Sequence, residues 1–381
     1  MQVLNAEPRE HLTVEQVTAV IQSADVSVDF GADLLDVNLG HLDDISVDVS
    51  GGSVDWGLNN AIHRKVRLQL SRRLNWGNEL VRPWMSLTAN GVTAKFFVGV
   101  FALTTPVRPI GESPESYEVD GFDRLYLLQR QVGADYTVAI GVTYRQALLD
   151  VFEAAGLSGA IIDGSAADNT LPEARTWLLV PDDTSDPDQT DTPVTWLRIV
   201  NDLNRAINFR SCWADDRGRF RCQAYQEPSV RAPEFVLDAD DRFKTIVGEN
   251  TTMVEDTWKA PNRWVFRWSN GGTGVEGDGI YTVDQSDAVS GDWLGRKLVW
   301  TSVVDYEAAS QPKLVELGDR RVAADKRIAT SFDLTTGPFP AAGHADVFTY
   351  IDAAVGSRKV MAISWSMDLA GGDCSWVLEG V

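Results

Sequence analysis

The sequence predicts a β-rich α+β protein in which two antiparallel β-barrels flank a helix-containing α/β domain. Two observations predict this class. Segments near both ends of the chain alternate apolar with polar residues, whereas two segments in the middle repeat apolar residues at helical spacing. With 381 residues, 44% of them apolar, the chain is long enough for two or three cores. We expect domains at residues 1–131, 132–235 and 236–381.

Residues 24–124 predict the first barrel. Successive side chains of a strand leave opposite faces of the sheet, so alternation marks half-buried strands. The alternating segments are residues 26–30, 45–49, 54–56 and 66–70. Glycine and asparagine accept positive φ and so supply tight turns between strands. The predicted turns are Gly51-Gly52, Asn59-Asn60, Trp76-Gly77-Asn78 and Asn90-Gly91.

Two amphipathic helices are predicted in the middle domain. Thr143 and Gln146 have the spacing of a capping box, and apolar residues follow at helical spacing until Gly156. A second helix begins near Thr195 with Trp196, Ile199, Val200, Leu203 and Ile207 on one face. This helix leads into a predicted hairpin over residues 209–225.

Cys212 and Cys222 flank the turn of that hairpin. They face each other if its loop holds three residues. Reduced thiols are favoured over a disulfide, because we expect the protein to be made in the cytosol.

An acidic loop, residues 182–192, separates the two helices. It holds Asp182, Asp183, Asp186, Asp188 and Asp191. Spaced aspartates can bind Ca²⁺, but the loop lacks the glycine and the terminal glutamate of an EF-hand. A solvated loop is therefore favoured over a calcium site.

The final third returns to strands and predicts the second barrel. Strand-like segments occur at residues 264–268, 280–283, 298–300 and 347–351, and residues 358–367 and 374–378 form a closing pair. One helix is predicted at about residues 312–329, with Pro312 in its first turn. Residues 258–304 are rich in Trp and Gly and form an insertion whose strand register the pattern leaves open.

Composition limits the partners. The formal net charge of −21 and the pI of about 4.5 predict that the chain repels a nucleic-acid backbone. The sequence has no run of 18 apolar residues, and it begins without the basic and apolar stretches of a signal peptide. We therefore expect no membrane insertion and synthesis in the cytoplasm.

The residues offer little material for catalysis, and we predict no catalytic residue, no cofactor and no metal site. The four histidines lack metal-ligand spacing, and neither a GxSxG nor a GxxxxGK[ST] motif occurs. Residues 272–277 match GxGxxG, but a strand follows them instead of a helix, which favours a hairpin tip. With 55 acidic residues, a glycosidase-type carboxylate pair can be neither identified nor excluded.

The order of several segments resembles a known family. In the first domain these are residues 49–56, 60–68, 79–84, 97–101 and 117–124. In the second they are Trp196, Asn201, Asp202, Leu203, Asn204, Asp216, Gly218 and Phe220. Over roughly residues 20–378 the chain resembles the minor tail proteins, or tail hubs, of long-tailed non-contractile phages of high-GC bacteria. That family is similar to the central baseplate hub of contractile-tailed phages.

The resemblance implies a structural virion protein and no enzyme. Hubs of this kind are homotrimers whose two tail-tube-like barrels per chain match a sixfold tail tube, so that the ring adapts the tube to threefold tip components. The implied partners are the tail-tube protein, the C-terminus of the tape-measure protein and a central fibre or tip protein. DNA would pass through the ring without specific binding, at the tail tip of the virion.

The distribution of charge suggests which residues face such a channel. Residues 10–63 contain ten acidic residues and no Lys or Arg. If Val26, Val28, Val47 and Val49 face the barrel core, the alternating polar residues face away from it. Asp25, Asp29, Asp48 and Asp55 are therefore candidates for a lumen that repels phosphates, although an ordinary solvated outer face explains them equally well.

Thirteen tryptophans support an alternative, a host cell-wall glycan-binding or glycan-hydrolysing tail-tip protein. Exposed aromatic rings can stack on sugars, but core packing is the favoured explanation for most of these residues. Those at predicted strand or helix positions include Trp56, Trp84, Trp196, Trp264 and Trp365.

Overall fold

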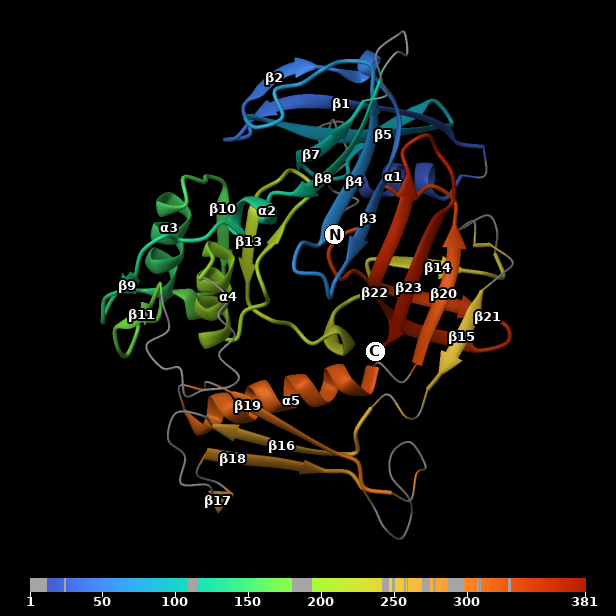
Figure 1. The fold of residues 1–381 in the computed structure, drawn as a ribbon. Coiled ribbons are helices and arrows are strands. Elements are labelled where there is room, and N and C mark those ends of the chain that lie inside the picture. The colour runs from blue at the N-terminus through green and yellow to red at the C-terminus, as the bar shows by residue number, and fades with distance from the viewer. Residues whose placement is uncertain are drawn as a thin grey trace.

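The computed structural model describes residues 12–381 apart from residues 24, 109–115, 180–193, 242–246, 249–250, 257, 259, 269–274, 277–278, 287–295, 297, 307, 309 and 328–329. Within these limits the strands form one 14-stranded sheet and three smaller sheets of three, two and four strands. Figure 1 shows the large sheet beside a helical part, with a small sheet and a helix at one end of the molecule. The β-rich α+β class is confirmed.

The first half of the large sheet comes from the N-terminal third. Its strands are β1 Ser27–Asp36, β2 His41–Asp44, β3 Val49–Gly57, β4 Arg64–Leu70, β5 Glu79–Ala89, β6 Val92–Phe97, β7 Phe101–Val107 and β8 Tyr117–Asp123. Helix α1, Val14–Ile21, begins with a capping box at Thr13 and contacts β5 and β6. The turn between β5 and β6 is Asn90-Gly91, both at positive φ, as the sequence predicts.

The second half comes from the C-terminal third. Its strands are β14 Phe235–Asp238, β15 Thr252–Glu255, β20 Thr330–Thr336, β21 Val347–Asp352, β22 Gly356–Asp368 and β23 Cys374–Gly380. The predicted closing pair, β22 and β23, is antiparallel and confirmed.

The two halves are joined into one sheet, which corrects the prediction of two separate barrels. Strand β22 has 13 residues, enough to pair with β21 through its first part and with β3 through its last. Trp365 of β22 lies opposite Trp56 of β3, and their rings stack at 6.3 Å. One apolar core contains residues of both halves, and the pairing of the described strands closes neither half into a barrel.

The helical part has its own core, from Leu125 to Cys222. Its helices and strands are α2 Leu125–Leu128, β9 Tyr136–Val138, α3 Tyr144–Ala154, β10 Ala160–Asp163, β11 Arg175–Trp177, α4 Trp196–Ala206, β12 Trp213–Ala214 and β13 Phe220–Gln223. The short 3-10 turn η3 Ser165–Asp168 follows β10, and a second, η4 Pro228–Val230, follows β13. Both predicted helices are confirmed, because the hydroxyls of Thr143 and Thr195 accept from backbone N–H groups in the first turns of α3 and α4.

The predicted hairpin is strands β12 and β13. Trp213 pairs with Arg221, which places Cys212 opposite Cys222. Both thiols are buried and reduced, and they contact each other. Burial is the main cause that raises the pKa of Cys212, followed by the hydrogen bond with Cys222. The structure places the two thiols face to face across the hairpin, as the sequence allows for a short loop.

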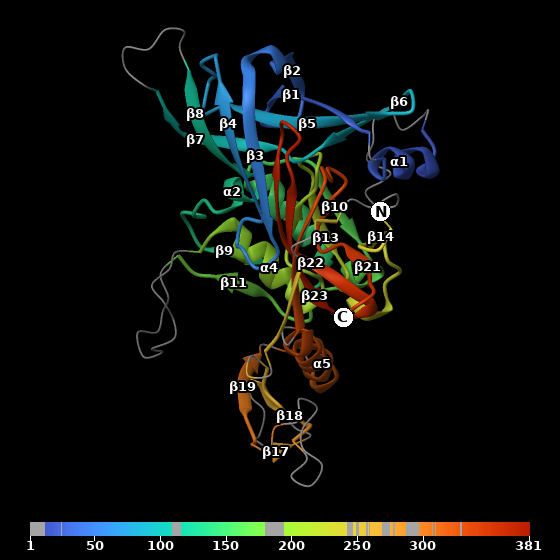
Figure 2. The same cartoon turned by 90° about the vertical axis from the view of Figure 1, so that its right-hand side faces the viewer.

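A four-stranded sheet and helix α5 form the end of the molecule opposite β1 and β2 (Figure 2). The strands are β16 Arg263–Trp268, β17 Val275–Glu276, β18 Gly279–Asp284 and β19 Thr301–Tyr306, and α5 is Gln311–Arg327. Strand β16 is antiparallel to β18 and parallel to β19, which defines the register that the sequence left open. The predicted helix is confirmed, and it packs on β16 and β18.

Two of the predicted strands and one predicted turn are wrong. Residues 46–48 form the 3-10 turn η2, so Val47 is 95% exposed although it was expected to face the core; Ile45 is buried instead. Gly51 and Gly52 lie inside β3 at a bulge, because β3 continues through them to pair with β4. Residues 298–300 are not a strand, because the buried side chain of Asn262 takes the hydrogen bonds of Leu298 O and Trp300 N.

Some predictions fall on residues that the structure does not describe. These are the predictions of a solvated acidic loop at residues 182–192 and of a hairpin tip at the GxGxxG match, whose Gly272, Gly274 and Gly277 lie outside the described residues. Among the described helices, none is long and apolar enough to cross a membrane.

Candidate functional site

The four aspartates proposed for a channel lie on different parts of the first half-sheet. Asp25, Asp29 and Asp55 are exposed, and Asp48 is partly exposed. Asp29 is on β1, opposite Ser86 of β5. Asp55 is on β3, which is separated from β1 by four strands in the sheet order. The structure therefore places Asp29 and Asp55 on strands that are not adjacent.

Basic side chains accompany two of these aspartates. Asp48 lies 3.6 Å from the Arg72 guanidinium and accepts a hydrogen bond from the Ser71 hydroxyl. Asp55 lies opposite Lys65, at the edge of a row of alternating charges across β3, β4 and β8. In that row Lys65 and Arg67 both form ion pairs with Asp120. The surface around Asp55 is thus mixed in charge.

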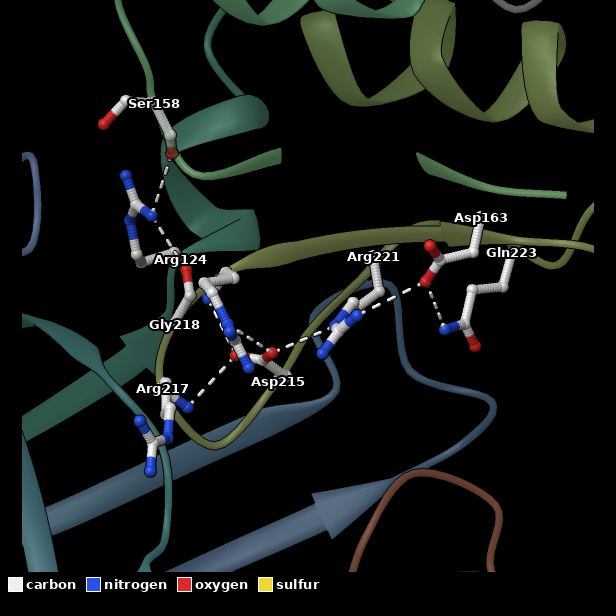
Figure 3. A network of polar contacts seen from close by, with 9 residues as sticks. Arg124, Ser158, Asp163, Asp215, Arg217, Gly218, Arg221 and Gln223 are labelled. Carbon is white, nitrogen blue, oxygen red and sulfur yellow. Dashed lines mark hydrogen bonds and ion pairs between the residues drawn. The ribbon is translucent and has the colours of Figure 1, made fainter. Parts of the chain in front are cut away.

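A buried polar network joins the helical part to the large sheet, and Arg124 makes three of its bonds (Figure 3). The Arg124 side chain is fully buried after strand β8. Its guanidinium donates to the carbonyls of Val37, Ser158 and Gly218 at 3.0, 3.2 and 2.8 Å. It also lies 4.7 Å from the Phe220 ring centroid. One side chain therefore joins the β1–β2 turn, the helical part and the β12–β13 hairpin.

Burial lowers the pKa of Arg124 to about 10, which leaves the side chain protonated at neutral pH. Gly218 must be glycine in this position. Its φ is +78°, and a Cβ atom would lie 2.7 Å from Val100. The close approach brings the Gly218 carbonyl within reach of Arg124.

Asp215 fixes the turn of the hairpin. Its carboxylate accepts from the backbone N–H groups of Arg217 and Arg219 and from the side chains of Arg219 and Arg221 at 2.8 to 3.1 Å. Arg221 then lies 3.4 Å from Asp163, which also accepts from Gln223 (Figure 3). These charge-assisted bonds hold β13 against β10 in one geometry.

A cavity of about 590 Å³ lies beside this network, between the hairpin, the start of β4 and residues 343–346. Its walls mix arginines with carboxylates: Arg64, Arg210, Arg221, Arg231, Asp163, Asp215, Asp216, Glu234 and Asp346. Burial raises the pKa of Asp216, with the neighbouring Asp215 as a second cause. It also raises the pKa of Asp346 to about 6.

Aromatic rings close one side of the junction. The imidazole of His344 stacks on Trp213 at 4.6 Å and meets His63 edge-on at 4.8 Å. Burial lowers the pKa of His63 to about 4 and that of His344 well below its ordinary value, so both are neutral at pH 7. Within the described ranges, no three His, Cys, Asp or Glu side chains are grouped as a metal site requires.

Sequence reasoning named Asp216, Gly218, Phe220 and Arg124 only as parts of a resemblance and assigned none of them a role. The available signal was the DDRGRF segment of the hairpin, where Asp215 is followed by arginines at two, four and six residues. The partners of Arg124 are 34 to 94 residues away, so no local pattern could reveal them.

Comparison of the fold with solved structures finds tail proteins. The tail protein from Neisseria meningitidis MC58 matches with a TM-score of 0.60 and 11% identity over 92% of this chain and 96% of that one. The 43 kDa tail protein of prophage MuSo2 from Shewanella oneidensis matches with 0.59 and 12% identity over 92% and 98%. Prophage tail protein gp18 from Listeria monocytogenes EGD-e matches with 0.54 and 10% identity over 92% and 94%.

The chain has the fold of these tail proteins. It is also similar to a chain of the Francisella PdpA-VgrG complex, with a TM-score of 0.52 and 8% identity over 94% of this chain and 53% of that one. No protein-family model and no curated protein sequence matches it. At these identities the similarity concerns the fold.

Proposed function

We propose that the chain is a structural protein of a phage tail and forms the hub of the tail tip or baseplate. In this role three copies form a ring that adapts a sixfold tail tube to threefold tip components and surrounds the DNA exit channel. The observation that carries the proposal is the match to three tail proteins over nearly the full length of each chain. A structural role, and no enzymatic one, fits that match.

The shape of the large sheet supports a ring. Each chain contributes two half-sheets, so three chains present six, which is the number a sixfold tube requires. The sheet ends at β2 on one side and at β15 on the other, and each of these pairs with a single neighbour among the described strands. Exposed strand edges favour association, and a closed ring satisfies them by symmetry.

The expected partners follow from this position. They are the tail-tube protein, the C-terminus of the tape-measure protein and a central fibre or tip protein, in a virion whose parts are made in the host cytoplasm. The fold similarity to a chain of the PdpA-VgrG complex supports a place in a larger assembly. The division into domains 1–131, 132–235 and 236–381 remains our proposal, supported by the separate core of the helical part.

A channel-facing role for Asp25, Asp29, Asp48 and Asp55 also remains a proposal. Asp25, Asp29 and Asp55 are exposed to solvent, which supports this role. The nearby Lys65 and Arg72 reduce the net negative charge around Asp55 and Asp48. Asp25 and Asp29 are therefore the better candidates for repelling DNA phosphates. A ring structure that places them on the outer wall would contradict this assignment.

Native mass over a range of protein concentrations tests the oligomeric state. A hub predicts a species of about three times the 41.9 kDa chain mass, with a fraction that grows with concentration. A chain that stays monomeric at every concentration, alone and with the tail-tube protein, would contradict the proposal.

One observation favours a second candidate, a glycan-binding or glycan-hydrolysing tail-tip protein. Trp258 and Trp300 are 56% and 44% exposed, with ring centroids 6.5 Å apart. The tryptophans that sequence analysis assigned to packing are not exposed: Trp56, Trp264 and Trp365 are buried, and Trp84 and Trp196 are partly buried. Saturable binding of cell-wall fragments that Trp300→Ala abolishes, or release of reducing sugars, would favour this candidate.

A further inference from the structure

A second cavity of about 530 Å³ lies between the turn at residues 58–61, helix α4, the start of the hairpin and helix α5. We call it the arginine cavity, because Arg210, Arg320 and Arg327 line it. Asn201 and Ser211 add polar groups, and Tyr225 adds an aromatic ring. The volume is in the range of small-molecule sites.

The charge of this cavity is unusual for the chain. Acidic residues outnumber basic ones by 55 to 34, yet no carboxylate is among the described residues that line the cavity. Arg327 has a carboxylate partner outside the lining, Glu227 at 2.6 Å. For Arg210 and Arg320, no carboxylate within the described ranges lies at ion-pair distance, although the charge of Glu234, farther away, partly offsets that of Arg210.

The hydrogen bonds of these two arginines, both of which line the cavity, use only some of their N–H donors. Arg320 donates from Nη1 to Phe209 O at 3.2 Å and to Asn208 Oδ1 at 3.4 Å, and its guanidinium carbon lies 4.0 Å from the Tyr225 ring centroid. Arg210 donates from Nη2 to Gln226 O at 3.3 Å. A guanidinium has five N–H donors, so each retains several that could bind a ligand.

Burial and repulsion between neighbouring arginines both disfavour the charged form of Arg210 and Arg320. Burial lowers the pKa of Arg210 to about 10, and Arg231 and Arg320 add to the effect. The pKa of Arg320 is also lowered, first by burial. A bound anion would offset both effects.

A second observation points to a ligand. His63 is 6% exposed and lines the cavity, and its Nδ1 has no hydrogen-bond partner in the part of the chain that the structure describes. The same holds for Nε of Arg327, whose side chain is 11% exposed. Buried polar atoms are rarely left without a partner. Both atoms are therefore available to a bound group.

We propose that the arginine cavity binds a small oxyanion, a phosphate or a carboxylate-bearing molecule, through Arg210, Arg320 and Arg327. Planar guanidinium groups bind such oxygens with two parallel hydrogen bonds. Arg210 precedes the hairpin, whereas Arg320 and Arg327 are on α5, which carries the small sheet. The anion would therefore hold the small sheet and α5 against the helical part.

Calorimetric titration of the full chain at constant ionic strength tests this proposal, with inorganic phosphate and citrate as separate probes. The expected result is saturable binding of one anion per chain, weakened about ten- to hundredfold by Arg320→Gln. Arg267→Gln is the matched control, because Arg267 is exposed and paired with Asp305. Tighter binding of phosphate would identify a phosphate ligand, and tighter binding of citrate a carboxylate ligand.

A second variant covers the case in which Arg320→Gln does not fold. Arg320→Lys keeps the charge and removes the planar fork, so we expect it to fold and to bind more weakly than wild type. The thermal midpoint of the wild type should also rise with phosphate or citrate and not with an equal ionic strength of chloride. Absence of saturable binding by both probes, or equal affinity in the wild type and in a folded Arg320 variant, would overturn the proposal.

Discussion

Arg124 shows how one residue can hold distant segments together. Its three acceptors are backbone carbonyls of segments far apart in the sequence, and Gly218 among them is buried. A guanidinium is suited to this because it presents several donors in a fixed plane. The side chain is fully buried, so water cannot replace these bonds without opening the junction.

Replacing Arg124 with methionine should destabilise the protein strongly. The change keeps most of the volume but leaves the carbonyls of Val37, Ser158 and Gly218 without their donor, and we expect a loss of about 2–4 kcal/mol in the free energy of unfolding. Arg267→Met, at an exposed ion pair, should cost at most about 1 kcal/mol. Urea unfolding followed by tryptophan fluorescence measures both; equal losses would contradict the role of Arg124.

Asp346 should give stability an unusual dependence on pH. Burial, with Glu234 nearby, raises its pKa from 3.8 to about 6. Between about pH 4 and pH 6 the folded state holds a proton that the unfolded state has released, so this group's contribution to stability falls as the pH rises. Asp346→Asn removes that loss, and its stability relative to wild type should grow by on the order of 2–3 kcal/mol across the window.

Unfolding midpoints of the two proteins at several pH values test this prediction. The difference between them isolates Asp346 from His63, whose lowered pKa acts in the opposite direction. Asp168→Asn is the control, because Arg145 lowers the pKa of this exposed carboxyl and its titration lies below the window. Parallel curves for wild type and Asp346→Asn would show that Asp346 does not titrate as proposed.

At the scale of elements, local signals predicted the helices and the hairpin correctly, whereas some short strands and the pairing of distant strands were not predictable. Helices α3 and α4 were predictable because Thr143 and Thr195 cap them and apolar residues follow at helical spacing. The hairpin was predictable from its turn. The joining of β22 to β3 was not, because partners more than 300 residues apart leave no local pattern. The 3-10 turn at Val47 was missed because alternating residues over a few positions also fit a strand.

Helix α5 and the small sheet offer a test of packing. A Cβ atom at Gly318 would lie 2.6 Å from the Phe266 ring and 2.7 Å from the Tyr281 ring. Alanine favours helices by about 1 kcal/mol over glycine, but overpacking typically costs about 1–3 kcal/mol. We therefore expect Gly318→Ala to be destabilising on balance. Gly77→Ala, with open space at its Cβ position, is the control; a thermal midpoint of Gly318→Ala at or above that of wild type would refute the close packing.

At the scale of the whole molecule, the open edges of the large sheet make the strongest prediction about assembly. Leu42 on β2 and Val254 on β15 are 52% and 43% exposed. If these edges meet in a ring, Leu42→Lys and Val254→Lys should reduce the trimer fraction at a given concentration, because lysine on an edge opposes strand pairing. Val230→Lys, at an exposed position in η4, should leave the fraction unchanged. Native mass measures all three, and unchanged trimers in both edge variants would exclude these edges from the interface.

The candidate site could be predicted from the sequence only in outline. The fold class, the helices and the hairpin that bears Cys212 and Cys222 followed from local patterns. The acidic residues were identified by their charge, but Lys65 and Arg72 beside two of them come from later strands and loops. The Arg124 network and the arginine cavity depend on contacts between the N-terminal, middle and C-terminal thirds, which only the folded chain brings together.

Electron-microscope class averages of the purified protein, alone and with the tail-tube protein, test the hub proposal most directly. The account predicts threefold rings with a central opening, in which the two half-sheets of each chain alternate around the ring. Particles that remain single chains, or that assemble without a threefold axis and an opening, would contradict it.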